Sequence, residues 1–196
     1  MQLLTASLRV AVATITICVV AYGTVILGVA QLFTPHTANG QLITTSDGTV
    51  VGSRQIAQRF TQPGYFWSRP SAVDYNGAGA GGSNKSPTSS DVTERAEALI
   101  EQYGASSENP LPPELAAASG SGLDPHISEH AALYQARRVS SARRLPQPRI
   151  EALIRERAAR PGGTLTSGRI VNVLALNLAL DSLTAAALAA ASVRTP

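Results

Sequence analysis

Residues 10–33, VAVATITICVVAYGTVILGVAQLF, decide the architecture of this chain because they contain no acidic or basic side chain. A helix of this length extends about 36 Å, enough to cross a hydrocarbon core of about 30 Å. A secretory signal has a shorter apolar stretch of about 7 to 15 residues, although Gly28-Val29-Ala30 resembles a cleavage site. A buried core helix normally carries a polar stripe, which this segment lacks. We therefore predict one retained transmembrane helix over residues 10–33.

The basic residues around this helix predict its orientation. Arg9 precedes the helix, and the next Lys or Arg after it is Arg54. Because basic residues favour the cytoplasmic side of a membrane, we expect residues 1–9 in the cytoplasm and residues 34–196 outside it.

A second apolar region, residues 170–193, would reverse this topology if it also crossed the membrane. It contains Asp181, Asn172 and Asn177, and about half of it is Ala, Ser and Thr. A carboxylate near the centre of a span costs about 2.5 to 3.5 kcal/mol, which small residues do not offset. We expect this region to belong to a soluble core, so that the membrane is crossed once.

The composition of the chain excludes several classes of protein. Its 196 residues are 44% hydrophobic and 15% charged, which excludes a wholly disordered chain. The net charge is only +3 and no basic run is longer than a pair, so we expect no nucleic-acid partner. Cys18 is the only cysteine, which excludes an intramolecular disulfide and a cysteine-built zinc site.

After the transmembrane helix, the sequence predicts a single small extracytoplasmic domain of the α+β class over residues 34–196. Residues 41–51 (QLITTSDGTVV) contain two β-leaning runs around an Asp-Gly pair, the pattern of a hairpin. Residues 170–181 fit a short strand that leads into a helix, although periodicity alone does not settle this. Apolar spacing, caps and prolines predict further helices over residues 91–103, 128–144 and 148–159.

Two irregular segments complete the predicted domain. Residues 61–71 (TQPGYFWSRPS) combine aromatic residues with prolines, and we expect Phe66 and Trp67 to anchor the core from this rigid loop. Residues 77–90 (GAGAGGSNKSPTSS) are of low complexity, and we expect them to be flexible.

Residues 126–130 (HISEH) match the HxxEH motif of zinc peptidases, which needs both histidines on one face of a helix. Ser128 is better suited to the N-cap of a helix than to its interior, so we expect His126 to lie outside the helix. We therefore predict no metal-binding and no catalytic residue. A membrane-anchored extracytoplasmic hydrolase that uses His126 and Asp124 stays open as the alternative function.

Residues 118–128 (ASGSGLDPHIS) are dense in Gly, Ser, Asp and Pro, which predicts a loop with a constrained backbone. Gly120 and Gly122 can accept positive φ, and Asp124 before Pro125 can accept hydrogen bonds from the amides that follow. We expect the loop to work by its shape, as an assembly or docking element. Its candidate residues are Ser119, Gly120, Ser121, Gly122, Asp124 and His126.

Together these motifs resemble the KdpC family, the C subunit of the bacterial Kdp potassium-transporting P-type ATPase. The resemblance covers the whole layout and rests on an N-terminal span, GSRQIAQRF at 52–60, YFWSRPSA at 65–72, GGSN at 81–84, the 118–128 loop, QARRVSSAR at 135–143 and NVLALNLALD at 172–181. The chain departs from the family pattern at Lys85 and Ser86, where the family usually has Leu-Gly, and at Glu129-His130, where it usually has Pro-Ala.

The resemblance implies an accessory subunit in the bacterial plasma membrane that is not itself an enzyme. Its implied partners are a channel-like A subunit, a B subunit that hydrolyses ATP with Mg, and membrane lipid; no cofactor is expected on this chain. Two mechanisms stay open. Either the chain raises the ATP affinity of the B subunit as a catalytic chaperone, or its exported domain sits over the outer mouth of the A subunit. Gln135 and Arg138 are the candidate nucleotide contacts, and a solvated helix face is the favoured interpretation of both.

Overall fold

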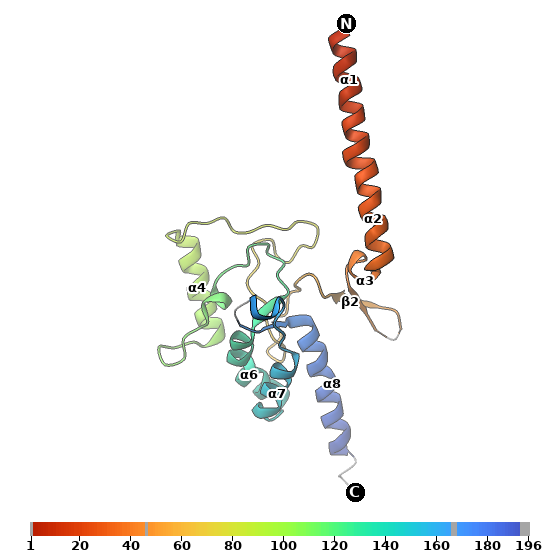
Figure 1. The fold of residues 1–196 in the computed structure, drawn as a ribbon. Coiled ribbons are helices and arrows are strands. Elements are labelled where there is room, and N and C mark those ends of the chain that lie inside the picture. Colours follow the sequence, from red (N-terminus) through yellow and green to blue (C-terminus); the bar gives the residue numbers. More distant parts are fainter. Residues whose placement is uncertain (1, 46, 166–167, 193–196) are drawn as a thin grey trace. The chain divides into compact units, whose positions relative to one another are not determined.

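The computed structural model describes residues 2–45, 47–165 and 168–192, and the chain divides into two compact units, residues 1–51 and 52–196. The first unit is dominated by one uninterrupted helix (Figure 1). It consists of α1 (Gln2–Ile15), a π-helical stretch (Thr16–Ala21) and α2 (Tyr22–Phe33). The helix begins eight residues before the predicted span, because the preceding residues are also compatible with a helix.

This helix has the properties predicted for a membrane span. Its 32 residues are strongly apolar, and none of its most apolar stretch is buried within the chain. Among the described residues it is the one helix long and apolar enough to cross a membrane. The π-helical stretch lies in its middle, where several β-branched residues crowd an α-helix and the Thr16 hydroxyl donates to the Val12 carbonyl over 2.8 Å.

A short helix and a hairpin follow α2, and the first unit ends within the second strand of the hairpin. α3 (Pro35–Ala38) is followed by β1 (Leu42–Thr44) and β2 (Val50–Ser53), which pair in a two-stranded sheet. The turn between them is closed by the Thr45 amide, which donates to the Thr49 carbonyl, and Gly48 adopts a φ of +84°. The predicted hairpin is therefore confirmed.

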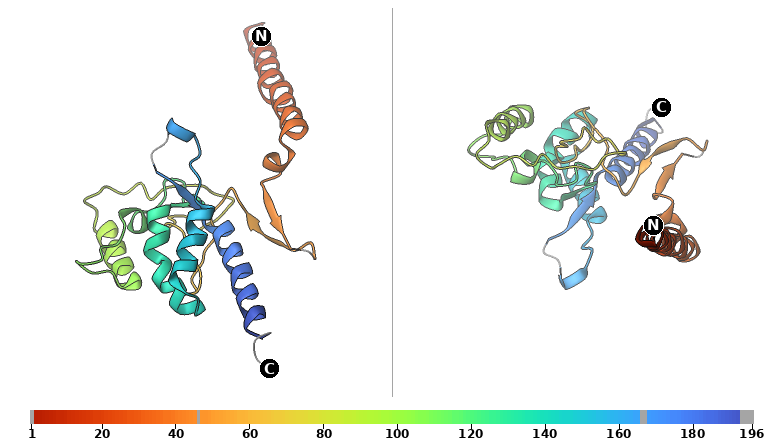
Figure 2. Two further views of the ribbon diagram at one scale, coloured as in Figure 1. Left: turned by 60° about the horizontal axis from the view of Figure 1, so that its bottom comes forward. Right: turned by 90° about the horizontal axis from the view of Figure 1, so that it is seen from above.

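The second unit is a small α+β body, which confirms the predicted fold class. β3 (His126–Ser128) and β4 (Ile170–Asn172) form an antiparallel pair with Ile127 opposite Val171. Three helices lie side by side next to this pair (Figure 2). They are α6 (Glu129–Arg143), α7 (Gln147–Arg157) and α8 (Val173–Ser192). The remaining helices are α4 (Ser90–Tyr103), α5 (Pro113–Ala116) and a 3-10 turn (Gly163–Leu165).

The helix boundaries follow the caps that the sequence contains. The Ser128 hydroxyl accepts from the Ala131 amide over 3.0 Å, so that α6 begins where it was predicted to begin. Gly104 and Arg144 end α4 and α6 in the left-handed conformation. The strand-then-helix pattern of residues 170–181 is also confirmed, since β4 leads directly into α8.

One hydrophobic core joins α6, α7, α8 and the two strands of the second unit. Phe66 is fully buried in it and Trp67 is only 8% exposed, so both predicted core aromatics are confirmed as buried. Trp67 meets Tyr103 edge-on, with ring centroids 5.0 Å apart. The core otherwise consists mainly of Leu115, Ile127, Val139, Ile150, Ile154, Val171, Leu176 and Leu180.

Two buried amide side chains hold the backbone of these aromatics between α6 and α8. The Gln135 Oε1 atom accepts from the Trp67 amide over 2.8 Å, and its Nε2 atom donates to the Trp67 carbonyl over 3.1 Å. Asn177 does the same for Phe66, at 2.8 Å and 3.0 Å. Gln135 and Asn177 are 1% and 2% exposed. We call these four residues the amide clamp; it satisfies backbone groups that otherwise have no partner in the core.

Two arginines of α6 fix the residues just before the clamp. Arg138 donates to the carbonyls of Pro63 and Tyr65 over 2.6 Å and 2.9 Å, and its guanidinium lies 3.6 Å from the centre of the Trp67 ring. Burial lowers the pKa of Arg138 to about 10, so the side chain stays cationic at neutral pH.

The second arginine connects residues 61–71, which we call the aromatic loop, to α8. Arg143 donates to the Gly64 carbonyl over 2.7 Å and forms a 2.7 Å ion pair with Asp181. The Tyr65 hydroxyl donates to the other Asp181 oxygen over 3.2 Å. Asp181, which argued against a second membrane span, is therefore an anchor for the aromatic loop.

We predict that Gln135→Ala lowers the free energy of unfolding by about 2 to 5 kcal/mol, because it leaves the Trp67 amide and carbonyl unpaired in the core. Trp67 is the single tryptophan, so denaturant unfolding followed by its fluorescence measures the loss. Gln147→Ala, on the exposed surface of α7, is the matched control and should change the value by less than about 0.5 kcal/mol. Equal effects of the two variants would contradict the clamp.

Candidate functional site

The predicted docking loop, residues 118–128, folds around one tight turn. The Gly122 amide donates to the Ser119 carbonyl over 3.2 Å, which closes the turn across residues 119–122. Ser119 and Gly122 are buried at its base, whereas Gly120 and Ser121 are exposed at its tip. Ser119 and Gly122, two of the residues expected to act in docking, thus shape the loop. Gly120 and Ser121 are accessible to a partner.

The two glycines of the loop have different roles. Gly122 adopts a φ of +68°, and a Cβ atom there would lie 2.6 Å from the Val73 side chain and 2.8 Å from the Gly81 carbonyl oxygen. Gly120 does not have positive φ, and nothing lies within 4 Å of the position of its Cβ. The expectation of special dihedrals is therefore confirmed for Gly122 and wrong for Gly120, which faces open space.

Backbone hydrogen bonds tie the loop to three distant segments. The Ser119 amide donates to the Pro70 carbonyl over 2.9 Å, and the Ala57 amide donates to the Leu123 carbonyl over 2.9 Å. The Gly81 amide donates to the Ser121 carbonyl over 2.7 Å. The flexibility expected of residues 77–90 stays a prediction, but Gly81 within that segment is bound to the loop.

Asp124 organises the second half of the loop. Its Oδ1 atom accepts from the His126 amide over 3.0 Å, which is the contact predicted for an Asp before a proline. Its Oδ2 atom lies 3.4 Å from the Arg69 guanidinium, which also donates to the Ala118 carbonyl. The His126 ring, whose Nδ1 atom lies 3.6 Å from Oδ1, the His126 amide and the Arg69 charge together lower the pKa of Asp124 against the opposing effect of burial. The carboxylate is therefore ionised at neutral pH and bound to its own loop.

The geometry gives no support to the hydrolase alternative. His126 lies in β3 and Ser128 caps α6, so His126 and His130 are on different elements. Glu129, the potential base of HxxEH, is paired with Arg169 at 3.3 Å. No hydrogen bond joins Ser119 or Ser121 to His126, and no group of three or more His, Cys, Asp or Glu that could hold a metal exists within the part of the chain that the structure describes.

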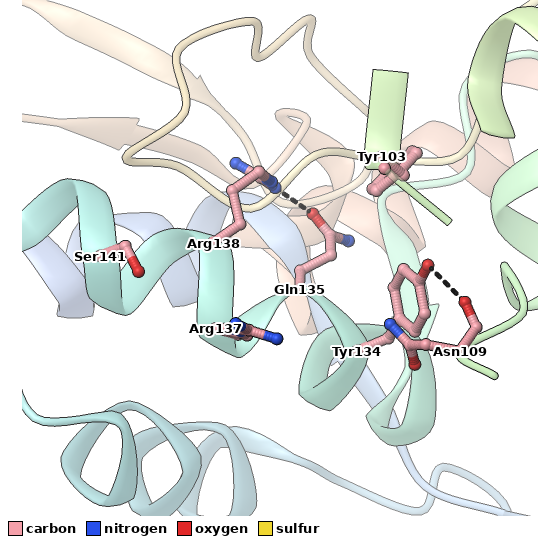
Figure 3. Close-up of a pocket in the computed structure, with 8 residues that line it drawn as sticks. Tyr103, Asn109, Tyr134, Gln135, Arg137, Arg138 and Ser141 are labelled. Atoms are coloured by element: carbon pink, nitrogen blue, oxygen red, sulfur yellow. Dashed lines mark hydrogen bonds between the residues drawn. The ribbon is translucent and has the colours of Figure 1, made fainter. Parts of the chain in front are cut away.

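The candidate nucleotide contacts lie beside a pocket of about 290 Å³ (Figure 3). Both polar ends of Gln135 are bound to Trp67, and Arg138 donates to Gln135 over 2.7 Å as well as to the aromatic loop. The favoured interpretation, a solvated helix face, is therefore wrong for Gln135 and for Arg138, which is partly buried. It fits Arg137, which is exposed.

Sequence reasoning missed the partners of the aromatic loop. Asn177 and Asp181 were considered only as polar residues that disfavour a membrane span. A signal for Gln135 was nevertheless present, because it falls on the same helical face as the buried residues Ala131, Ala132 and Val139. A polar residue in such a stripe indicates a buried hydrogen-bonding partner. Lys85, one of the residues at which the chain departs from the family pattern that it resembles, forms an ion pair with Asp91.

We predict that Gly122→Val lowers the free energy of unfolding by at least about 2 kcal/mol, because it adds backbone strain and an overlap with Val73. Gly120→Val, two residues away, should change it by less than about 0.5 kcal/mol, because its side chain enters open space. Tryptophan fluorescence during denaturation measures both. An equal loss of stability in the two variants would contradict the assignment of Gly122 to the packed base of the loop and of Gly120 to its open tip.

Comparison with known proteins identifies the family of the chain. A family model described as the K+-transporting ATPase, c chain, matches residues 4–182. The potassium-transporting ATPase KdpC subunit of Parvibaculum lavamentivorans is 61% identical over 181 residues, which cover 92% of this chain and 97% of that relative. The KdpC subunit of Gemmatimonas aurantiaca is 44% identical over 99% of this chain and all of its own length, and that of Synechocystis is 44% identical over 82% of this chain and 88% of its own length. The expected resemblance is confirmed, and the chain belongs to the KdpC family.

Proposed function

We propose that this chain is a non-catalytic accessory subunit of a potassium-transporting ATPase complex, where it joins a channel-like A subunit to an ATP-hydrolysing B subunit. Membership of the KdpC family supports a role in potassium transport. The observation that carries the proposal is the docking loop, which presents an exposed tip on a buried and hydrogen-bonded base. Such a loop can offer a fixed shape to a partner without reorganising when it binds.

The helix over Gln2–Phe33 anchors the chain in the bacterial plasma membrane in this proposal. Arg9 and the absence of Lys or Arg before Arg54 favour a cytoplasmic N-terminus. The second unit then lies outside the cytoplasm, where it can cover the outer mouth of the A subunit. ATP and Mg are bound by the B subunit on the other side of the membrane.

The state of Gln135 and Arg138 bears on the catalytic-chaperone mechanism. Both side chains are engaged with the aromatic loop, so binding a nucleotide through them would require breaking the amide clamp. That cost favours a structural role for these residues. It supports assembly from the outer face over direct contact with ATP.

The proposed topology predicts the behaviour of a fusion after Pro196. Alkaline phosphatase fused there should be active, because it folds only outside the cytoplasm, and a fluorescent reporter that requires the cytoplasm should be dark. Fusions after Arg9 should give the opposite pattern, which makes them the matched control. A silent phosphatase after Pro196 would reverse the orientation.

The docking role predicts that Gly120→Val weakens co-purification of the A and B subunits by about tenfold or more, since it blocks the tip of a folded loop. Gly79→Val is the matched control, because the Gly79 Cβ position is also open and lies outside the loop. Ser121→Ala should leave the potassium-dependent ATPase activity of the assembled complex within about threefold, because shape, and no hydroxyl chemistry, is required. Loss of activity in a fully assembled Ser121→Ala complex would indicate chemistry at the loop.

A further inference from the structure

The pocket beside α6 has a composition that the docking loop does not explain. Its lining contains arginine, tyrosine, amide and hydroxyl side chains, and no acidic residue. The volume is about 290 Å³, which is room for one side chain of a partner and several waters. The lining residues are Tyr103, Gly104, Asn109, Tyr134, Gln135, Arg137, Arg138 and Ser141.

One wall of this pocket is rigid and positively charged. Arg138 is fixed by the carbonyls of Pro63 and Tyr65 and by Gln135, and it stays cationic at neutral pH. The Tyr134 hydroxyl donates to the Asn109 carbonyl over 3.3 Å. Burial raises the pKa of both Tyr103 and Tyr134, so their hydroxyls stay neutral. The pocket therefore holds positive charge next to two neutral tyrosine side chains.

Three polar side chains at the pocket have no hydrogen-bonding partner among the described residues. They are the guanidinium of Arg137, the amide of Asn109 and the hydroxyl of Ser141, one helical turn beyond Arg137. Two exposed arginines of α7 are paired within the chain, Arg155 with Glu151 and Arg157 with Glu156. The donors of the pocket are thus available to a ligand.

We infer that this pocket receives an aspartate or glutamate side chain from an extracytoplasmic segment of a partner subunit, an inference that rests on the proposed function. Arg137 binds the carboxylate, which a guanidinium can grip through two parallel hydrogen bonds. Asn109 and Ser141 supply further donors. Arg138 stays bound to the aromatic loop, and its fixed positive charge favours an anion in the pocket.

The test measures association of the purified full-length chain with the purified A and B subunits in detergent, at low and at high salt. Arg137→Glu should raise the dissociation constant by about tenfold or more at low salt, and Arg137→Gln should raise it less and flatten its salt dependence. Arg149→Glu is the matched control, because Arg149 is exposed on α7, has no ion pair among the described residues and lies outside the pocket. It should change the constant by less than about threefold.

Three outcomes distinguish a failure of this inference from a failure of the proposed function on which it rests. If the wild-type chain binds both subunits and Arg137→Glu binds equally well, the inference is overturned and the proposed function stands. If the wild-type chain binds neither subunit, the proposed function fails. If the isolated chain binds Mg-ATP and Arg137→Gln abolishes that binding, the pocket is a nucleotide site and the inference of a partner carboxylate is wrong. A charge swap tests the pair directly: the Arg137→Glu variant is combined with a partner subunit in which an acidic residue is changed to arginine. Restored binding in that combination would confirm the ion pair.

Discussion

The second unit depends on satisfying the backbone of Phe66 and Trp67. Their side chains are buried, and their peptide groups enter the core with them, outside any strand or helix. An unpaired buried amide or carbonyl costs about 1 to 3 kcal/mol, so two consecutive residues without partners would offset much of what the aromatic rings contribute. Gln135 and Asn177 act in place of neighbouring strands, and in doing so they join α6 and α8 through the aromatic loop.

The position of the docking loop follows from this clamp. The chain leaves Trp67 and within three residues reaches Pro70, whose carbonyl accepts from Ser119. Arg69 lies between them and contacts both Ala118 and Asp124. Residues that follow the clamp therefore hold the base of the docking loop, and the docking loop is fixed to the core through them. This explains why Gly, Ser and Asp gather there without assembling a catalytic group: they shape the backbone.

Local features were the ones that the sequence predicted well. The hairpin, the start of α6 at Ser128 and the end of α4 at Gly104 depend on residues close together in the chain. The burial of Phe66 and Trp67 was also predicted, because large aromatics between prolines have few alternatives. The role of Gln135 was not, since its partner Trp67 is 68 residues away and helical periodicity carries no information about which loop covers a helix. Gly120 was misjudged for a related reason: composition indicates a turn, but it does not say which glycine takes the positive φ.

The most direct test of the clamp is amide hydrogen exchange at Phe66 and Trp67, measured residue by residue in the full-length chain. Exposed loop amides exchange through small local openings, whereas amides of the core exchange only when much of the domain opens. If Gln135 and Asn177 hold these two backbone segments, both amides should exchange at least about a thousandfold more slowly than an unstructured peptide and as slowly as the buried face of α6. Exchange at the rate of an open loop, while α6 remains protected, would contradict the clamp.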